Sequence, residues 1–447
     1  MFDNSFTALD TIGKNGLFTA VAFRWVMKLK IIIPFVLVAG ILNRVEAQTY
    51  DTNGDYVQTF AGSGFYGYVD GVGQLTMFHN PDAVVADSHG NLFVWDSNNG
   101  RIREIAPNTT VTTFAGGGSD NSGFGTNVSL PSINAVAIDT NNTIWFTAGS
   151  YSSTFFLYEI TSDALVTRKS ISTPSYLSYS SNPAGICVDS LGNIYISDSY
   201  NHQIYRYANG VISVFAGSGN QGYADGNGIF TAFNSPAALA ADAANNIYVW
   251  DSGNYLIRKI DQNQNVTTFA GTYNGSYYGG ANMDGSGTNA SFSSINQMCF
   301  DHAGNLYLAC GNCIRKIDAQ TNVVTMAGSF TVTGYTNGAG NLARFNGAYG
   351  VCLSSGAIFV ADSINQRIRD ITFNPSTQPV LPASLHLSTY PGLQIIGTVG
   401  RTYQIQASPD MNTWNTAATV LLTSSPYLWI DQNSVSGNKF YRALLLP

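Results

Sequence analysis

The stretch AVVADSHGNLFVWDS, residues 83–97, decides the fold because it recurs along the chain. Each copy joins an apolar segment, an Asp-x-x-Gly-Asn turn and an aromatic-centred segment that often ends in Asp-Ser. Close or degenerate copies lie at 135–148, 185–199, 238–252, 298–310 and 350–363. The first Asp, or the residue aligned with it, falls at 87, 139, 189, 242, 301 and 354, so the repeat length is 50 to 59 residues.

A repeat of this length is typical of propeller blades or of a solenoid. The first unit holds four strand signals, AVVAD, NLFVWD, RIREI and VTTFAG, with turn residues between them. Four short antiparallel strands make one blade, and closing blades into a ring protects the sheet edges. Six units within 50–373 therefore predict an all-β fold, a six-bladed β-propeller. A β-solenoid is the alternative, although its turns are normally shorter.

The composition agrees with strands, tight turns and aromatic packing. Only 11% of the residues are charged, while 13% are aromatic and 45 are glycines. These values argue against helical bundles, coiled coils and disorder. The formal net charge of −7 excludes a basic protein that binds nucleic acid through its phosphates, and it makes anionic membrane surfaces poor partners.

The first 47 residues follow a different pattern. Met27 begins a short basic segment, Ile31 to Leu42 is apolar, and Val45-Glu46-Ala47 supplies a small-x-small cleavage pattern. This layout predicts a secretory signal peptide in 1–47, with the true start at Met27. An uncleaved anchor is the alternative, but the apolar run is short for a membrane span. We expect a secreted or periplasmic protein without membrane insertion after cleavage.

The repeated residues resemble a known family. The pattern Asp-x-x-Gly-Asn-Ile-Tyr-Val-x-Asp-Ser-x-Asn-x-x-Ile-Arg follows Phe-Ala-Gly and Asp-Gly-x-Gly-x-x-x-x-Phe-x-x-Pro. It is similar to the NHL repeat of exported bacterial propellers and teneurin-like ectodomains, over about 55–373. The second unit departs most, because Ala148 replaces the second Asp and no Phe-Ala-Gly follows in 149–180.

Two features predict how the ring is built. The position two residues before the first repeat Asp is always small, as expected for the innermost strand: Val85, Ala137, Cys187, Ala240, Cys299 and Cys352. The three cysteines are therefore interpreted as small buried residues rather than reactive ones. The sixth unit lacks a Phe-Ala-Gly strand, and an orphan copy stands at 57–62. We expect this copy to supply the outermost strand of the last blade.

The Asp of each Asp-Ser is interpreted as structural, because it recurs from blade to blade. Asp96 and Asp362 are expected to accept hydrogen bonds from turn amides. Five residues later, on the returning strand, Arg101 and Arg367 are expected to pair with them across the hairpin.

The repeat stops at Pro375. Residues 374–383 are rich in proline and predict a stiff linker. Short strand patterns fill 384–447 and resemble a small C-terminal β-domain of secreted bacterial proteins. We expect a β-sandwich-like accessory domain there.

The loops that lead into the inner strands are the candidate ligand surface. They place tyrosines and carboxylates among glycines at 64–73, 219–228, 277–287 and 333–340. Tyrosine faces suit sugars or protein side chains, and carboxylates could coordinate Ca²⁺. The alternative is that these residues only build turns. The ligand-binding candidates are Tyr66, Tyr68, Asp70, Tyr223, Asp225, Tyr278, Asp284 and Tyr335.

Catalysis is the rival hypothesis, because gluconolactonase-like hydrolases and an amidating lyase use related propellers. Glu104 and Glu159 lie on third strands, away from the axis where such relatives hold a metal. None of the five histidines lies on an innermost strand. We therefore expect a monomeric binding module for protein or carbohydrate, with no catalytic residues, resident metal or cofactor.

The last expectation is a disulfide between Cys310 and Cys313. These cysteines occupy the positions of Asp96 and Arg101 in the fifth unit. An exported chain meets oxidising conditions, under which such a bond persists. Unpaired thiols and a Cys-x-x-Cys redox centre are the alternatives, the latter without the usual helix N-terminus.

Overall fold

The computed structural model describes residues 55–149, 156–169, 181–273 and 282–373, together with the ranges 384–387, 393–396, 401–408, 414–421, 427–429 and 440–445. The predicted signal region 1–47, the linker 374–383 and Tyr278 lie outside these ranges. Within the described residues, no helix is long and apolar enough to cross a membrane.

The described residues from 55 to 373 form six antiparallel sheets. Sheet 1 contains β3 (Pro81–Ala86), β4 (Leu92–Asp96), β5 (Arg101–Ile105), β6 (Thr110–Gly116) and the short β2 (Gly71–Val72). Sheet 2 contains β8 (Ile133–Ile138), β9 (Ile144–Ala148), β10 (Phe156–Ile160), β11 (Leu165–Arg168) and β7 (Gly123–Phe124). Sheet 3 contains β12 (Pro183–Val188), β13 (Ile194–Asp198), β14 (Gln203–Ala208) and β15 (Val211–Ala216).

The remaining three sheets follow the same order. Sheet 4 contains β17 (Pro236–Ala241), β18 (Ile247–Asp251), β19 (Leu256–Ile260), β20 (Asn265–Ala270) and β16 (Gly226–Asn227). Sheet 5 contains β22 (Gln297–Phe300), β23 (Leu306–Ala309), β24 (Cys313–Ile317), β25 (Asn322–Gly328) and β21 (Gly285–Ser286). Sheet 6 contains β27 (Ala348–Ser354), β28 (Ala357–Asp362), β29 (Arg367–Thr372), β1 (Tyr56–Ala61) and β26 (Gly338–Ala339).

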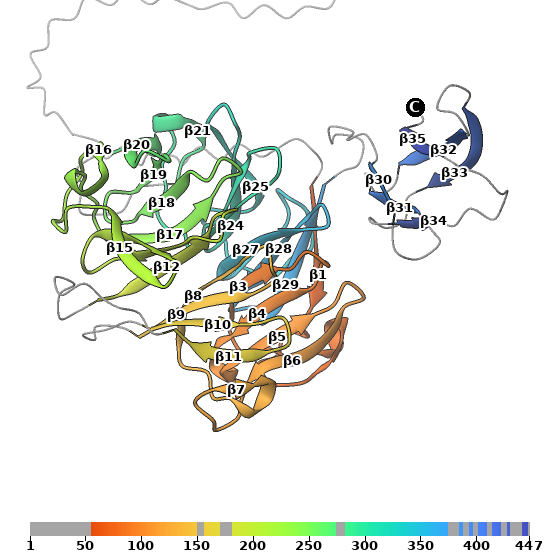
Figure 1. Ribbon diagram of the computed structural model, residues 1–447, viewed down its shortest axis with the longest axis horizontal. Helices are drawn as coiled ribbons and strands as arrows, with labels where there is room; N and C mark the ends of the chain where they lie inside the picture. Colours follow the sequence, from red (N-terminus) through yellow and green to blue (C-terminus); the bar gives the residue numbers. More distant parts are fainter. Residues whose placement is uncertain are drawn as a thin grey trace, which may run out of the picture. The chain divides into compact units, whose positions relative to one another are not determined.

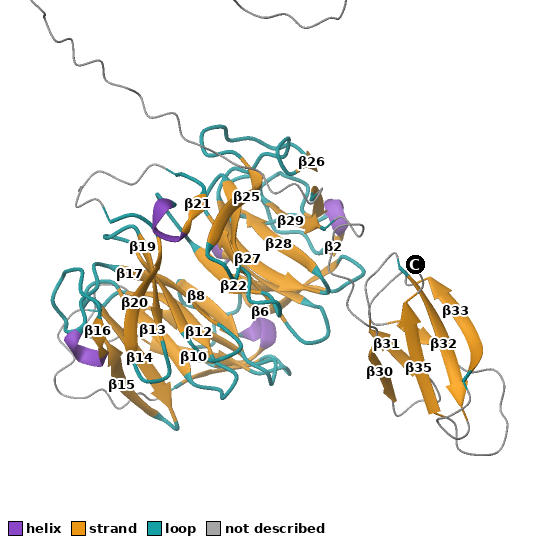
Figure 2. Ribbon diagram, turned by 90° about the horizontal axis from the view of Figure 1, so that it is seen from above, coloured by secondary structure: helices purple, strands orange, loops and turns teal. Residues whose placement is uncertain are grey.

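The sheets are arranged as a propeller around a common centre (Figure 1). Their first strands contact one another in the closed cycle β3, β8, β12, β17, β22, β27 and back to β3. Figure 2 shows strands joined by loops, and the helices of the described residues are single 3-10 turns, η1 (Gly73–Leu75), η2 (Ser97–Asn99), η3 (Gly125–Asn127), η4 (Gly228–Phe230) and η5 (Gly287–Asn289). The predicted all-β propeller fold is confirmed.

The repeat phrase builds a hairpin around its aspartate. Oδ1 of Asp87 accepts from the backbone N–H of His89 at 2.9 Å and of Asn91 at 2.8 Å, and Oδ2 accepts from the Asn91 amide at 2.8 Å. The same bonds recur at Asp189, Asp242 and Asp301. In these four copies the Asp and Asn therefore turn the inner strand back into the second strand, as Asx turns do.

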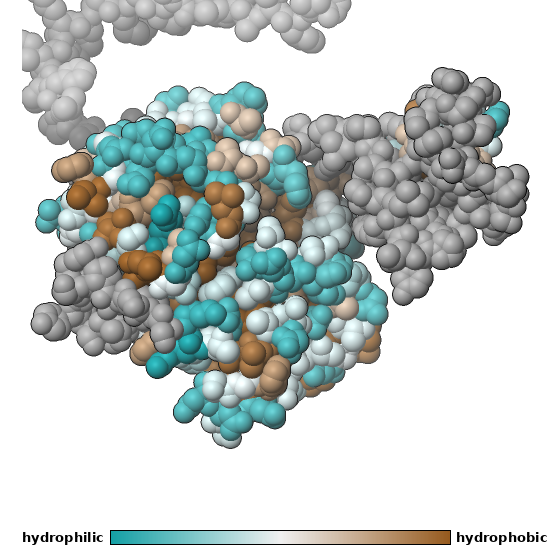
Figure 3. Space-filling view, viewed as in Figure 1, coloured by the Kyte–Doolittle hydropathy of each residue, from teal (hydrophilic) through white to brown (hydrophobic). Residues whose placement is uncertain are grey.

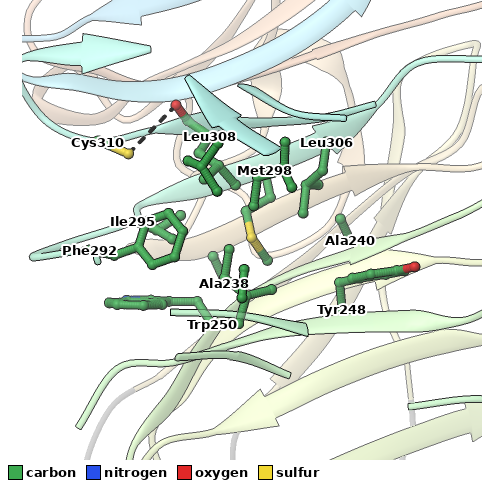
Figure 4. Packing of buried hydrophobic residues seen from close by; sticks show 14 of the residues in the cluster. Ala238, Ala240, Tyr248, Trp250, Phe292, Ile295, Met298, Leu306, Leu308 and Cys310 are labelled. Carbon is green, nitrogen blue, oxygen red and sulfur yellow. Dashed lines mark hydrogen bonds between the residues drawn. The ribbon is translucent and has the colours of Figure 1, made fainter. Parts of the chain in front are cut away.

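The core lies between neighbouring sheets. Every residue of β4 and of β18 is buried, because these second strands are covered on both faces. Figure 4 shows one such layer. In it, Met298 of sheet 5 lies between Leu308 of the same sheet and Ala238 of sheet 4. At the centre the strands approach so closely that a Cβ on Gly185 would lie 2.3 Å from the Ala237 carbonyl oxygen.

The predicted small residues of the inner strands are buried, apart from the half-buried Cys299. Burial raises the pKa of the Cys187 and Cys352 thiols and brings that of Cys299 to about 12. These thiols therefore stay protonated at neutral pH, which agrees with their interpretation as packing residues.

The orphan copy closes the ring as expected. Strand β1 pairs antiparallel with β29, so that Val57 lies opposite Ile371 and Gln58 opposite Asp370. The Gln58 amide also donates to Asp370 at 2.8 Å. In sheet 2, where Phe-Ala-Gly is missing, β11 supplies the fourth strand instead.

The C-terminal part is also β-structure. It contains two three-stranded antiparallel sheets, β30 (Ser384–Leu387), β31 (Leu393–Ile396) and β34 (Tyr427–Trp429), and β33 (Asn415–Leu421), β32 (Thr402–Ser408) and β35 (Phe440–Leu445). Two sheets agree with the predicted accessory β-domain, whose boundaries stay a prediction.

Ring closure predicts a specific loss of stability. Val57 is fully buried in β1 and occupies the place that the buried Val266 has in β20. We expect Val57→Ala and Val266→Ala each to lower the free energy of unfolding by about 2 kcal/mol, because each removes buried methyl groups and leaves a cavity. Chemical unfolding of the full chain measures both. An unchanged stability in Val57→Ala alone would contradict closure through β1.

Candidate functional site

Four buried arginines organise the loops that sequence analysis singled out. Arg103, Arg258, Arg315 and Arg369 are fully buried and come from the third strands of sheets 1, 4, 5 and 6. We call each of them, with its partners, an arginine clamp. In sheet 1, Arg103 donates to Asp96 at 2.8 Å and to Asp70 at 2.5 Å, and also to the carbonyl oxygens of Met77 and Val69. One guanidinium thus binds the chain on both sides of residues 71–76.

The same clamp recurs in sheets 4 and 6. Arg258 pairs with Asp251 and Asp225, and Arg369 pairs with Asp362 while donating to Asn337 at 2.6 Å. Burial raises the pKa of Asp251 to about 6, while hydrogen bonds from Asn254, from the backbone N–H of Asn234 and from Arg258 act in the opposite direction.

Aromatic rings complete the clamps. The Arg103 guanidinium lies 5.2 Å from the ring centre of Phe78 and 4.9 Å from that of Tyr68. Tyr223 and Tyr335 lie against Arg258 and Arg369 at 5.0 and 5.2 Å. Each contact of a cation with an aromatic face is attractive, more so when the cation is desolvated.

The candidate tyrosines and carboxylates that the structure describes are therefore held in separate sheets rather than gathered at one point. The hydroxyl groups of Tyr68 and Tyr223 lie 2.9 and 3.2 Å from threonine hydroxyls of β6 and β20, and that of Tyr335 lies 3.5 Å from Thr59 of β1. Asp284 is bound by Arg315 and its side chain is 1% exposed. Tyr66 is exposed, with its ring 5.5 Å from that of His79.

The expected pairing of Arg101 with Asp96 and of Arg367 with Asp362 is wrong. The two residues of each pair do lie opposite each other across the hairpin. The carboxylates, however, bind the arginine two residues further along, Arg103 or Arg369. Arg101 instead lies 4.1 Å from the Tyr68 ring, and Arg367 lies 3.6 Å from the Tyr335 ring.

Sheet 5 carries a modified clamp. Cys310 stands where the other clamps have an aspartate, and Arg315 compensates by donating twice to Asp284, from Nε at 3.1 Å and from Nη2 at 2.9 Å. Cys310 and Cys313 are buried free thiols in the structure. The Cys310 thiol donates to the Leu308 carbonyl oxygen (Figure 4), and the Cys313 thiol is hydrogen-bonded to Cys310, which raises the pKa of Cys313. The disulfide stays a prediction.

A pocket of about 360 Å³ opens at the centre of the ring. Its lining includes the residue five positions before the repeat Asp in all six units, and we call these residues the rim: Asp82, Asn134, Ala184, Ala237, Asn296 and Tyr349. Trp95 and Gln297 also line this axial pocket. Repetition of the fold thus brings six equivalent positions to one place, and their chemistry differs from sheet to sheet.

The polar groups of the axial pocket are positioned by the inner strands. Oδ1 of Asp82 accepts from the Ser363 hydroxyl at 2.6 Å, and the Asn134 amide donates to the Pro183 carbonyl oxygen at 2.7 Å. Gln297 bonds to both the N–H and the carbonyl of Val84, so it links the inner strands of sheets 5 and 1. Asn296 and Tyr349 are exposed at the rim.

The sequence predictions did not include the rim. Its signal was present, since one position of an otherwise regular repeat holds Asp, Asn, Ala and Tyr in different copies. The loop residues were predicted because they recur. In the structure, the recurring loop carboxylates and amide bind the clamp arginines. In the described residues, no three His, Cys, Asp or Glu side chains cluster so that they could hold a metal ion.

Comparison with known proteins agrees with the repeat. Residues 181–207 match the NHL repeat. The chain is 41% identical to NHL repeat-containing protein 2 of Bos taurus over 92 residues, which are 20% of this chain and 12% of the relative. It is 35% identical to the chloroplast protein suppressor of quenching 1 of Arabidopsis thaliana over 85 residues, 19% of this chain and 8% of that one. The chain thus spans a small part of these relatives, and the predicted NHL resemblance is confirmed.

Solved structures share the fold. A protein of unknown function from Bacteroides thetaiotaomicron has a TM-score of 0.56 at 21% identity, over 72% of this chain and 76% of that chain. An auxiliary nutrient binding protein from the same species has a TM-score of 0.55 at 18% identity, over 71% and 76% of the two chains. At these identities the likeness shows the propeller fold.

The clamps predict unequal effects of their members. We expect Arg258→Met to lower the free energy of unfolding by about 3–5 kcal/mol, because it leaves the buried Asp251 carboxyl without its cation. Asp225 is 49% exposed, so Asp225→Asn is expected to cost at most about 1 kcal/mol. Urea unfolding at neutral pH measures both variants. If the two variants lost the same free energy of unfolding, the buried pair of Arg258 and Asp251 would not be the main stabilising contact of the clamp.

The thiol pair predicts a disulfide under oxidising conditions. The Cys310 N–H donates to the Cys313 carbonyl oxygen at 2.9 Å, so the two residues lie opposite each other at the end of the hairpin. A disulfide requires that their Cα atoms lie within about 7 Å of each other. We expect protein from an oxidising compartment to lose the mass of two hydrogens and to resist alkylation at both positions. Cys310→Ser is the control. Alkylation of both thiols without reductant would refute the bond, whose stabilisation should fall below about 2 kcal/mol because the loop is so short.

Proposed function

We propose that this chain is an exported binding module whose axial pocket holds a carbohydrate. The observation that carries the proposal is the rim, where a carboxylate, two amides and a tyrosine converge on one pocket of about 360 Å³. Carboxylate and amide groups exchange several hydrogen bonds with vicinal hydroxyls. The exposed aromatic ring of Tyr349 suits the apolar side of a sugar ring.

Two further points support binding as the main activity. Two Bacteroides proteins of the same fold are auxiliary nutrient binding proteins. Among the described residues that line the axial pocket, Asp82 is the one carboxylate, whereas hydrolysis of a glycosidic bond commonly uses a pair. The signal-like segment that ends at Ala47 supports export.

Binding predicts a direct test with rim variants. A glycan array of neutral saccharides, followed by calorimetry with the best binder, measures affinity for the full chain. We expect Asn296→Ala to weaken binding about three- to tenfold, because one hydrogen bond to a neutral group is lost, and Asp82→Asn to weaken it more. Asn263→Ala, an exposed asparagine in a turn between β19 and β20, is the control and should bind normally.

Three outcomes would overturn the proposal. Binding of no saccharide would remove it, and so would binding that survives both rim substitutions. Turnover of the bound saccharide or of a sugar lactone by the wild-type chain would replace it with an enzyme of the hydrolase or lyase class.

A further inference from the structure

A second, polar pocket lies between sheets 3 and 4. It measures about 610 Å³, and we call it the sheet 3–4 groove. Its lining combines amides, hydroxyls, a tyrosine and a histidine: Asn182, Ser199, Tyr200, Asn201, His202, Gly219, Asn220, Gln221 and Ser235. Of these, Tyr200 is 53% exposed and offers an open aromatic face.

The linings of the groove and of the axial pocket come within two residues of each other at the start of two inner strands. Asn182 of the groove and Ala184 of the rim flank Pro183 at the start of β12, and Ser235 and Ala237 flank Pro236 at the start of β17. The strands β12 and β17 pack against each other. At these two places the rim residue is alanine, whereas the other four rim residues have larger side chains. The rim side chains are therefore smallest on the side of the groove.

Hydrogen bonds within the protein fix the polar groups that line the groove. The buried carboxylate of Asp198 accepts from the backbone N–H groups of Asn182, Tyr200 and Asn201 at 3.0 to 3.1 Å. The Asn182 amide donates to the Ser199 hydroxyl at 2.9 Å. Such fixed polar groups bind with little loss of conformational entropy.

His202 completes the floor. It has a φ of 55°, and its Nδ1 accepts from the Ser235 N–H at 3.0 Å. The ring proton therefore belongs on Nε2, which makes that nitrogen a donor.

At the junction between sheets 6 and 1, side chains bridge the two sheets. There Gln366 and Asn80 stand at the positions of His202 and Ser235. The N–H of Asn80 donates to Gln366 Oε1 at 2.7 Å, and the two side-chain amides also bond to each other at 3.1 Å. Arg367 fills the adjacent space, where a Cβ on Gly64 would lie 2.2 Å from its guanidinium. The corresponding residue of sheet 3 is the shorter Gln203.

We propose that the sheet 3–4 groove extends the axial pocket and adapts the propeller to linear oligosaccharides rather than single sugars. The proposal rests on carbohydrate binding at the rim. One sugar unit occupies the axial pocket, and the chain leaves over Ala184 and Ala237. The next units then lie against Tyr200 and exchange hydrogen bonds with Asn182 and Gln221.

The test is the dependence of affinity on ligand length. Calorimetry of the full chain is run with two homologous series, glucose to cellohexaose and glucose to maltohexaose. We expect affinity in one series to rise with length, and Tyr200→Ala to lower the affinity for the longer ligands about three- to tenfold, as for the loss of one aromatic contact, without changing that for the shortest ligand that binds. Tyr56→Ala, which removes a similarly exposed tyrosine from the outer strand β1, is the control and should bind every ligand normally.

A second variant closes the groove without removing the tyrosine. The double substitution His202→Gln, Ser235→Asn installs the pair found at Gln366 and Asn80, and it should abolish the gain with length. If short saccharides bind and depend on Asn296 but affinity does not rise with length, or the rise survives both groove variants, the groove proposal fails and the proposed function stands. If no saccharide of either series or of the array binds, the proposed function fails with it.

Discussion

Four guanidinium groups removed from water set the geometry on which the rest of the structure depends. A buried cation must regain its lost hydrogen bonds inside the protein. The Nη groups of each clamp arginine do so with carbonyl and carboxylate or amide oxygens of the loop that leads into its own sheet. That loop connects an outer strand with the next inner strand. Holding it therefore determines where the inner strand begins, and so where its rim residue reaches the axial pocket.

Sheets 2 and 3 depart from this rule. Tyr158 and Tyr205 occupy the strand position of the clamp arginine. The buried Asp198 of sheet 3 then has no arginine among its described hydrogen-bond donors, and it accepts from backbone N–H groups instead. The equivalent aspartates of sheets 1, 4 and 6 neutralise an arginine, whereas Asp198 positions the backbone that forms the wall of the sheet 3–4 groove. The groove thus lies beside a sheet that does not carry the clamp arginine.

The local fold could be predicted from the sequence because its determinants are short-range. The Asp87 and Asn91 pair fixes one hairpin, and the orphan strand at 57–62 is recognisable by its own pattern. Side-chain partners were harder, because Arg101 and Arg103 lie two residues apart on one face of a strand. The arginine that is more deeply buried binds Asp96. Which of the two is buried depends on the conformation of the covering loops, and this conformation cannot be read from the sequence.

The candidate site could not be predicted from recurring residues for a related reason. A pocket on the axis of a repeat receives one side chain from each copy, so identical copies would present the same group from every side. A ligand that lacks such symmetry is held in one orientation only if the copies differ. Here they differ at the rim, with Asp82 and Tyr349 on one side and Ala184 and Ala237 on another. In a propeller, residues that recur therefore build the ring, and residues that break the recurrence at the axis determine what it can bind.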